Sequence, residues 1–283
     1  DLQSFLDLYY GCCSVLLTER DFEDMTYAYL ERAAADRVVH TEIFFDPQTH
    51  TARGVPFDTV IDGICAALDR ARTDLGLSSR LIMCFLRHLS EEEAFATLAQ
   101  AAPHLDRIAA VGLDSSELGN PPSKFERVFA AARAQGLKAV AHPGEEGPPS
   151  YISEALDLLR VERVDHGVAC EKDESLVERL VAEKTPLTVC PLSNLALRVV
   201  EDLREHNLAR LLARGLCVTI NSDDPAYFGG YVGTNYQAVV DALGLEASDC
   251  VVLAENSIRA SFLADEDKQR WLLEIERVAA APR

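Results

Sequence analysis

Positive charge is scarce in this sequence. Its 283 residues include 27 Lys and Arg against 46 Asp and Glu, which gives a formal net charge of −19 at pH 7. This field repels the phosphates of nucleic acids and of anionic lipids, so we expect no nucleic acid and no membrane surface as partner. A neutral or cationic small molecule fits the charge better. The sequence leaves open whether copies of the chain form a homo-oligomer.

Long apolar runs and paired cysteines are also missing. No window approaches the ~20 uninterrupted apolar residues that a membrane span needs, and no N-terminal stretch resembles a signal peptide. The eight cysteines include no Cys-x-x-Cys pair and are too dispersed for a disulfide scaffold. We therefore expect a cytoplasmic protein whose thiols are reduced.

Seven short apolar runs, rich in β-branched residues, alternate with longer amphipathic segments. The runs cover residues 38–45, 80–86, 108–114, 138–142, 163–167, 186–191 and 217–223. Such alternation predicts βαβ units and a parallel sheet. The length suits a (β/α)8 barrel formed as one domain over residues 1–283. An open doubly wound sheet is the competing architecture, but no Gly-rich phosphate loop follows an early strand to support its nucleotide-binding version.

Helical patterns fill the intervals between these runs. Residues 56–76 have apolar side chains close to a 3.6-residue period, with Gly76 as the predicted stop. Ser90 opens the next helix and acidic residues fill its first turn. In residues 121–136, Ser123 and Glu126 predict a capping box. No internal repeat or linker indicates a second domain.

A closed barrel of this kind needs eight strands, whereas the sequence predicts seven. Residues 1–17 and 19–37 both have helical patterns, so we expect the missing strand to precede Asp1. The seven predicted strands then correspond to barrel strands two to eight.

Polar side chains follow every predicted strand. They are Asp46, Arg87, His88, Asp114, Ser115, Ser116, Glu117, His142, Glu145, Glu146, Asp165, His166, Ser193, Asn194, Asp223 and Asp224. In a barrel, the active site is built from the carboxyl ends of the strands and the loops after them. A site that combines a metal with a proton shuttle needs such a convergence.

Three of these strand ends indicate specific chemistry. In AHPGEEG, His142 offers an imidazole to a divalent metal and Glu145 a carboxyl group that can move protons beside it. In NSDDP, Asp223 can ligate a cation while Asp224 accepts hydrogen bonds from a substrate. In RVDHGV, His166 can act as a general base. Each motif alone also fits an ordinary turn, but their occurrence together favours a catalytic site.

The remaining histidines indicate less. We interpret His40, His50, His104 and His206 as structural or solvated residues, because they lie within a strand, loop or helical patterns. His88 follows a strand but stands beside a helix cap, so it fits a loop role equally well.

With these motifs the sequence resembles the adenosine and adenine deaminase family, metal-dependent (β/α)8 barrels of the amidohydrolase superfamily. The resemblance extends over nearly the whole chain. Its most specific stretches are FFDPQTHTARGVPF, FLRHLSEE, VGLDSSELGNPPSKF, HPGEEGPP, VERVDHGV, LTVCPLSN and NSDDPAYFGGYV. FFDPQTH and GLDSSE are similar to the bacterial and fungal adenine deaminase branch.

The resemblance implies a site for one zinc ion per chain and a free purine base as the small-molecule partner. His142 and Asp223 would ligate the zinc, and zinc lowers the pKa of a bound water from ~15.7 toward ~7. Glu145 would donate a proton to the purine ring, His166 would orient and help deprotonate the water, and Asp224 would bind the substrate. The implied reaction converts adenine to hypoxanthine and ammonia.

The resemblance also implies a basis for substrate selection. Ser115 and Glu117 lie where relatives contact the far edge of the purine, so they would bind N3 and N9. In a nucleoside the ribose covers N9. We therefore expect an acidic residue near this edge to exclude adenosine.

Two departures from the family pattern matter. Family members carry a His-x-His pair that supplies two more zinc ligands at the end of their first strand, and this sequence contains no such pair. Relatives more often have alanine at the position of Pro143. Proline stiffens the loop here, because its ring fixes φ. The absence of one N-terminal segment would account for both the missing strand and the missing ligands, so we favour it over a divergent fold. If the chain were complete, we would expect little zinc and negligible turnover, with barrel strands two and eight either exposing their edges or pairing with each other.

Other functions stay open at this stage. A deaminase of N6-substituted adenines, such as cytokinins, is the nearest alternative, and adenosine is a less favoured substrate. A non-catalytic binding barrel without a complete metal site would bind purines and release no ammonia. The cytidine-deaminase type is disfavoured because no Pro-Cys-x-x-Cys motif occurs. The sequence does not identify the metal.

Overall fold

The computed structural model describes residues 1–281, which form two compact units. The first unit comprises residues 1–142 and 154–161, and the second begins at residue 143 and continues from residue 162. The single domain predicted over residues 1–283 stays a prediction, and its last two residues lie outside the described part of the chain.

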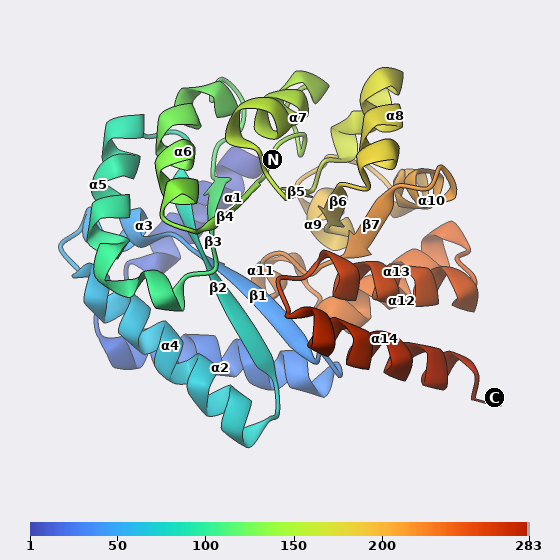
Figure 1. Ribbon diagram of the computed structural model, residues 1–283, viewed down its shortest axis with the longest axis horizontal. Coiled ribbons are helices and arrows are strands. Elements are labelled where there is room, and N and C mark those ends of the chain that lie inside the picture. Colours follow the sequence, from blue (N-terminus) through green and yellow to red (C-terminus); the bar gives the residue numbers. More distant parts are fainter. Residues whose placement is uncertain (282–283) are drawn as a thin grey trace. The chain divides into compact units, whose positions relative to one another are not determined.

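Parallel strands form the centre of the first unit. They pair in the order β1 (His40–Phe45), β2 (Ser78–Leu86), β3 (Ala110–Asp114) and β4 (Lys138–Ala141) (Figure 1). The helices of this unit are α1 (Leu2–Cys13), α2 (Glu19–Ala35), α3 (Pro47–Thr51), α4 (Phe57–Asp74), α5 (Glu91–Ala101) and α6 (Glu126–Ala134), with the short turns η1 (Ala102–Arg107), η2 (Pro122–Phe125) and η3 (Ala155–Leu159).

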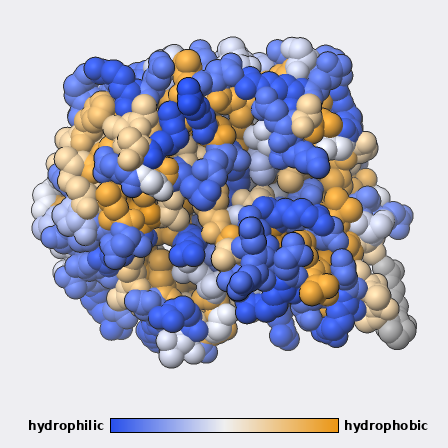
Figure 2. All heavy atoms as spheres, in the orientation of Figure 1, coloured by the Kyte–Doolittle hydropathy of each residue, from blue (hydrophilic) through white to orange (hydrophobic). Residues whose placement is uncertain are grey.

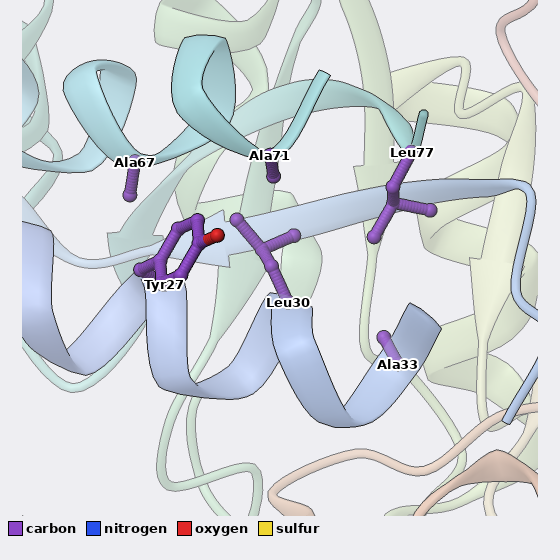
Figure 3. Packing of buried hydrophobic residues seen from close by; sticks show 6 residues of the cluster. All are labelled: Tyr27, Leu30, Ala33, Ala67, Ala71 and Leu77. Carbon is purple, nitrogen blue, oxygen red and sulfur yellow. The ribbon is translucent and has the colours of Figure 1, made fainter. Parts of the chain in front are cut away.

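Two of these helices, α2 and α4, pack closely. Figure 3 shows Tyr27 and Leu30 of α2 pointing toward Ala67 and Ala71 of α4, and all four side chains are buried. A Cβ atom at Gly63 of α4 would lie 2.3 Å from the Glu19 carbonyl oxygen. Glycine therefore sets the separation of the two helices at this point.

The predicted helix caps are mostly confirmed. Ser90 caps α5 by accepting from the backbone N–H of Glu93, and three glutamates fill the first turn. Gly76 follows the C-cap of α4 with φ +67°.

The capping box predicted at Ser123 and Glu126 is wrong. Residues Pro122–Phe125 form a 3₁₀ turn, and Phe125 precedes α6 without a side-chain cap. The first amides of α6 instead donate to Glu91 of α5, from Arg127 N at 2.7 Å and from Val128 N at 3.0 Å. A carboxylate from another helix thus satisfies the α6 N-terminus.

The second unit contains three parallel strands in the order β5 (Arg163–Asp165), β6 (Pro186–Val189) and β7 (Cys217–Ile220). Its helices are α7 (Pro149–Glu154), α8 (Glu174–Glu183), α9 (Pro191–Ala196), α10 (Leu208–Ala213), α11 (Pro225–Phe228), α12 (Val232–Leu243), α13 (Ala247–Ala260) and α14 (Asp265–Ala279), with the 3₁₀ turns η4 (Val168–Lys172) and η5 (Leu203–Glu205).

All seven predicted strands are present, each within a few residues of the predicted bounds. The two helices predicted before the first strand are present as α1 and α2. Hydrophilic side chains cover most of the face in Figure 2, with hydrophobic ones scattered between them. Among residues 1–281, no helix combines the length and the apolar character that crossing a membrane requires.

Candidate active site

The polar residues predicted at strand ends lie after the strands in both units. In the first unit, Asp46 follows β1, Asp114 ends β3 and His142 follows β4 directly. His142 N donates to the Leu113 carbonyl at 2.9 Å, which fixes the end of β4 against β3. Because parallel strands end at one edge of a sheet, these side chains belong to the carboxyl edge of the first unit.

The ring of His142 is oriented by its neighbours. Its Nδ1 lies 3.3 Å from the Leu113 carbonyl oxygen, and Phe44 contacts the ring edge-on with centroids 5.0 Å apart. A carbonyl oxygen only accepts, so Nδ1 carries the proton in this contact. Nε2 is then the nitrogen whose lone pair can ligate a metal, the usual arrangement for a metal-binding histidine.

Arg87 ties together several parts of this edge. Its side chain is fully buried, and it donates from Nη1 to the His142 carbonyl at 2.7 Å and from Nε to the Asn120 carbonyl at 2.9 Å. Nη1 also lies 3.9 Å from Oε1 of Glu117, whose side chain is 1% exposed. The sequence placed Arg87 at a strand end but did not predict this role.

A pair of carboxyl groups lies beside a thiol in the same unit. One oxygen of Asp46, one of Asp114 and Cys84 Sγ are within 4.8 Å of one another. Burial raises the pKa of Asp46, and burial together with the Asp46 charge raises the pKa of Asp114 well above its usual value. Oδ1 of each aspartate has no hydrogen-bond partner among the described residues. The pair therefore favours holding a proton.

Ser115 follows β3 in the left-handed conformation, with φ +75°. Its hydroxyl lies 2.7 Å from Tyr10 Oη and 2.8 Å from Nδ1 of His88. Burial and then the Lys124 charge lower the pKa of His88, which keeps that ring neutral at pH 7. Two side chains therefore hold Ser115 in place.

The second unit brings together three residues that the sequence predicted to be functional. His166 Nε2 lies 3.7 Å from Glu145 Oε2 and 3.7 Å from Asp223 Oδ2. His166 is 2% exposed and Glu145 is 6% exposed, whereas Asp223 is partly open to solvent. Asp224 comes next in the chain and precedes α11. A base, a buried acid and a carboxylate therefore share one small volume.

Backbone conformation aims these side chains. His166 and Asp223 both have positive φ, at +57° and +56°, which non-glycine residues rarely adopt. In the loop before Glu145, Gly144 has φ +73°, and a Cβ atom there would lie 2.5 Å from Ile152 Cδ1. Strained backbone of this kind is typical of functional sites.

Cys190 is a neighbour that the sequence did not predict. It follows β6, is 6% exposed, and its Sγ lies within 4.8 Å of donor atoms of His166 and Asp223. Burial, followed by the charges of Asp223 and Glu145, raises the pKa of its thiol well above the usual value. A cysteine in an apolar run resembles a core residue, and only its place at a strand end distinguishes it.

Ser193 and Asn194, which the sequence also placed at a strand end, are fully buried. His206 Nε2 lies 3.1 Å from Asn194 Oδ1, and Leu208 N donates to His206 Nδ1 at 3.0 Å. The structural role predicted for His206 is confirmed. His40, His50 and His104 likewise contact their neighbours, Ser78, Arg53 and Asp58.

The predicted site residues fall in both units. Ser115, Glu117 and His142 belong to the first, and Glu145, His166, Asp223 and Asp224 to the second. Each unit has its own group of interacting side chains, and the metal pair His142 and Asp223 stays a prediction.

Parallel strands that alternate with helices and pair in sequence order within each unit, with polar residues at their carboxyl ends, are typical of an α/β-barrel enzyme. The family model for adenosine deaminase matches residues 1–278. The chain therefore belongs to the adenosine deaminase family.

Individual relatives agree with this assignment. An adenine deaminase from Cupriavidus metallidurans is 61% identical over 281 residues, which cover 99% of this chain and 79% of the relative. The crystal structure of adenine deaminase from Arthrobacter aurescens has a TM-score of 0.98 and 54% identity, and the match covers 99% of this chain and 86% of that one. An amidohydrolase from Burkholderia ambifaria, solved with bound Zn, has a TM-score of 0.87 and 27% identity, covering 94% and 76% of the two chains.

These comparisons confirm the family resemblance and the fold class, a (β/α)8-type barrel with seven strands in the described residues. The open doubly wound alternative is thereby excluded. The predicted enzyme class, a hydrolytic deaminase, is confirmed as well.

Proposed function

We propose that this protein catalyses the zinc-dependent hydrolytic deamination of adenine to hypoxanthine and ammonia. The observation that supports adenine as the substrate is the 61% identity with an adenine deaminase over nearly the whole chain. The group formed by Glu145, His166 and Asp223 supports the chemistry, because it combines a buried acid, a buried base and a carboxylate that can ligate a metal.

The donor atoms of this chain fit zinc in kind. His142 presents Nε2 because Nδ1 faces the Leu113 carbonyl, and Asp223 supplies a carboxylate. Imidazole nitrogen and carboxylate oxygen are both common zinc ligands. Zinc would be held by these two residues in our proposal, while the His-x-His pair of the family has no counterpart in this sequence. When bound, zinc would supply a water of low pKa for attack on the base.

The side chains of the chain carry the proton transfers. Hydrolysis forms a C–O bond at C6 of adenine and breaks the bond from C6 to the amino nitrogen. Glu145 gives a proton to N1 of the ring, and His166 accepts a proton from the attacking water. Asp224 accepts a hydrogen bond from the base and orients it. The amino nitrogen takes up the proton held by His166 and leaves as ammonia, and the second proton of the water restores the Glu145 acid.

Ser115 and Glu117 provide the proposed selection for a free base. Both follow β3, and Arg87 lies 3.9 Å from Glu117. We propose that they contact the N3 and N9 edge, which ribose covers in adenosine. Comparable turnover of adenine and adenosine would contradict this proposal.

The test is ammonia release from adenine, adenosine and isopentenyl-adenine by the purified chain, with its metal content measured. Glu145→Gln should lower kcat on adenine by ~10²- to 10⁴-fold while metal content is unchanged. Glu183→Gln is the matched control, because Glu183 is half exposed on α8. A higher rate of amine release from isopentenyl-adenine than from adenine would instead favour an N6-substituted substrate. Purine binding without any release of ammonia would favour a non-catalytic barrel.

Metal binding has its own test. His142→Ala should lower zinc affinity by at least ~10-fold, as removal of a ligand requires. His104→Ala is the control, because His104 contacts Asp58 and lies outside the proposed site. Equal zinc affinity in the two variants would exclude His142 as a ligand. The cytoplasmic location of the enzyme remains part of the proposal.

A further inference from the structure

The hydroxyl of Ser115 lies between two ring side chains that come from other parts of the first unit. Its Oγ is 2.7 Å from Tyr10 Oη on α1 and 2.8 Å from Nδ1 of His88, which follows β2. The two rings lie close together, with centroids 6.1 Å apart. The function proposed above uses Ser115 but assigns no role to Tyr10 or to α1.

The backbone of Ser115 indicates why the residue needs these partners. Its φ of +75° is left-handed, a conformation that serine rarely adopts. Strain of this kind costs ~1–3 kcal/mol and persists only where the surrounding structure fixes it. Hydrogen bonds to Tyr10 and His88 hold the short side chain in one direction. Removal of either bond would free the hydroxyl to turn.

A second contact joins α1 to the same loop. Ser116 Oγ donates to Gln3 Oε1 at 2.6 Å. Gln3 and Tyr10 are seven residues apart on one continuous helix, so their side chains lie on the same face of it. Two turns of α1 therefore contact two successive residues of the loop after β3.

The other end of α1 is held by residues of the stretch FFDPQTHTARGVPF. Arg53 Nη2 donates to the Cys13 carbonyl at 2.8 Å and also to the Leu16 carbonyl. His50 Nδ1 lies 2.8 Å from the same nitrogen, and burial lowers the pKa of this histidine to about 4, so its neutral ring accepts. A cation beside a helix C-terminus also stabilises the helix dipole. The helix is therefore fixed at both ends.

Tyr10 stays a neutral hydrogen-bonding group in this position. Burial and the charge of Asp114 raise the pKa of its phenol, so the phenol keeps its proton at pH 7. A protonated phenol can both donate and accept, as the Ser115 hydroxyl can. The contact between the two hydroxyls therefore persists across the pH range in which the enzyme would be assayed.

We propose that Tyr10 is a positioning residue that aims the Ser115 hydroxyl at the N3 and N9 edge of the bound base. The inference rests on the proposed function, because that function places this edge beside Ser115. The edge lies across the purine from C6, so its contacts change little between the bound substrate and the transition state. Loss of the contact should therefore raise KM and leave kcat nearly unchanged. In this way α1 takes part in the selection of a free base.

The test is ammonia release from adenine by the purified chain and its variants, with KM and kcat measured separately. Tyr10→Phe should raise KM by ~3- to 10-fold, as the loss of one hydrogen bond predicts, and change kcat by less than ~2-fold. Tyr29→Phe is the matched control, because Tyr29 Oη makes a similar contact, 3.0 Å from Thr41 Oγ1, near the start of β1. The control should leave KM unchanged.

A double variant assigns the effect to Ser115. Tyr10→Phe should have no further effect on KM in a Ser115→Ala background, because the hydroxyl that it positions is gone. Two adenine analogues assign the effect to the purine edge, since 9-methyladenine lacks the N9 proton and 3-deazaadenine lacks the N3 nitrogen. For at least one of them, Tyr10→Phe should change the inhibition constant by less than ~2-fold.

The outcomes separate this inference from the proposed function. Ammonia release from adenine with an unchanged KM in Tyr10→Phe would overturn the inference alone. A full effect of Tyr10→Phe in the Ser115→Ala background, or on both analogues, would do the same. A fall in kcat of ~10-fold or more at constant KM would also overturn it, because an edge contact far from C6 does not act in this way. Absence of ammonia release from adenine by the unmodified chain would overturn both.

Discussion

Arg87 offers the sharpest test of how the first unit holds its strand ends. Arg87→Met keeps the length and the apolar part of the side chain but removes the guanidinium. The carbonyls of His142 and Asn120 then lose their donors, at 2.7 and 2.9 Å, and Glu117 loses the cation 3.9 Å away. Water cannot replace these lost contacts, because Arg87 is fully buried and Glu117 is 1% exposed.

The expected cost follows from these contacts. Removal of one partner from a buried ion pair costs ~3–5 kcal/mol, because the other charge stays buried. Each carbonyl left without a donor adds ~1–3 kcal/mol before relaxation. A loss of at least ~3 kcal/mol is a large part of the ~5–15 kcal/mol by which a domain is usually stable.

Urea unfolding followed by circular dichroism measures this loss. Arg87→Met, Glu117→Gln and the double variant form a cycle in which the double variant should cost less than the sum of the single ones, because Glu117→Gln removes the unpaired charge. Arg204→Met is the control, since 77% of the Arg204 side chain is exposed, and should change stability by under ~0.5 kcal/mol. A loss below ~1 kcal/mol for Arg87→Met, or additivity within ~0.5 kcal/mol, would refute the reasoning.

Two further predictions concern single buried groups. Burial lowers the pKa of His206 from 6.5 to about 4, so its contribution to stability is fully present above pH 6.5 and is lost as the pH falls toward 4, by up to ~3 kcal/mol. His206→Gln should therefore flatten the fall in the free energy of unfolding across this window, and an unchanged slope would contradict the assignment. Glu91→Gln should cost ~1–2 kcal/mol in urea unfolding, because Glu91 caps α6. Glu92→Gln, with 76% of the side chain exposed, should be neutral, and equal losses would rule out the cap.

The fold was largely predictable because local signals dominate it. Apolar runs such as residues 80–86 and 217–223 are short, β-branched and bounded by turn residues, and they form β2 and β7. The cap of α6 was not predictable in this way. Ser123 fits a local rule, but a carboxylate from Glu91, 35 residues before Glu126, satisfies the helix instead.

The candidate site was predictable where residue type alone indicates chemistry. His166 and Asp223 stood out as strand-end histidine and aspartate, and the structure brings them within 3.7 Å. Cys190 and Arg87 did not stand out. A cysteine in an apolar run has the sequence signature of a core residue, and the partners of Arg87 lie 30 to 55 positions further along the chain. Their roles follow from tertiary contacts.

The two units deal with concentrated negative charge in different ways. Buried carboxyl groups avoid the cost of charge either by keeping a proton or by facing a cation. Asp46 and Asp114 follow the first route, since burial raises the pKa of both carboxyl groups and the Asp46 charge raises that of Asp114 further. In the second unit, the carboxylates of Glu145 and Asp223 both lie 3.7 Å from His166 Nε2, and a dication bound beside them would neutralise their charge. A cation at 100 times its Kd stabilises the state that binds it by ~2.7 kcal/mol. Metal should therefore raise the melting temperature through the second unit, and Asp223→Asn should remove most of that increase.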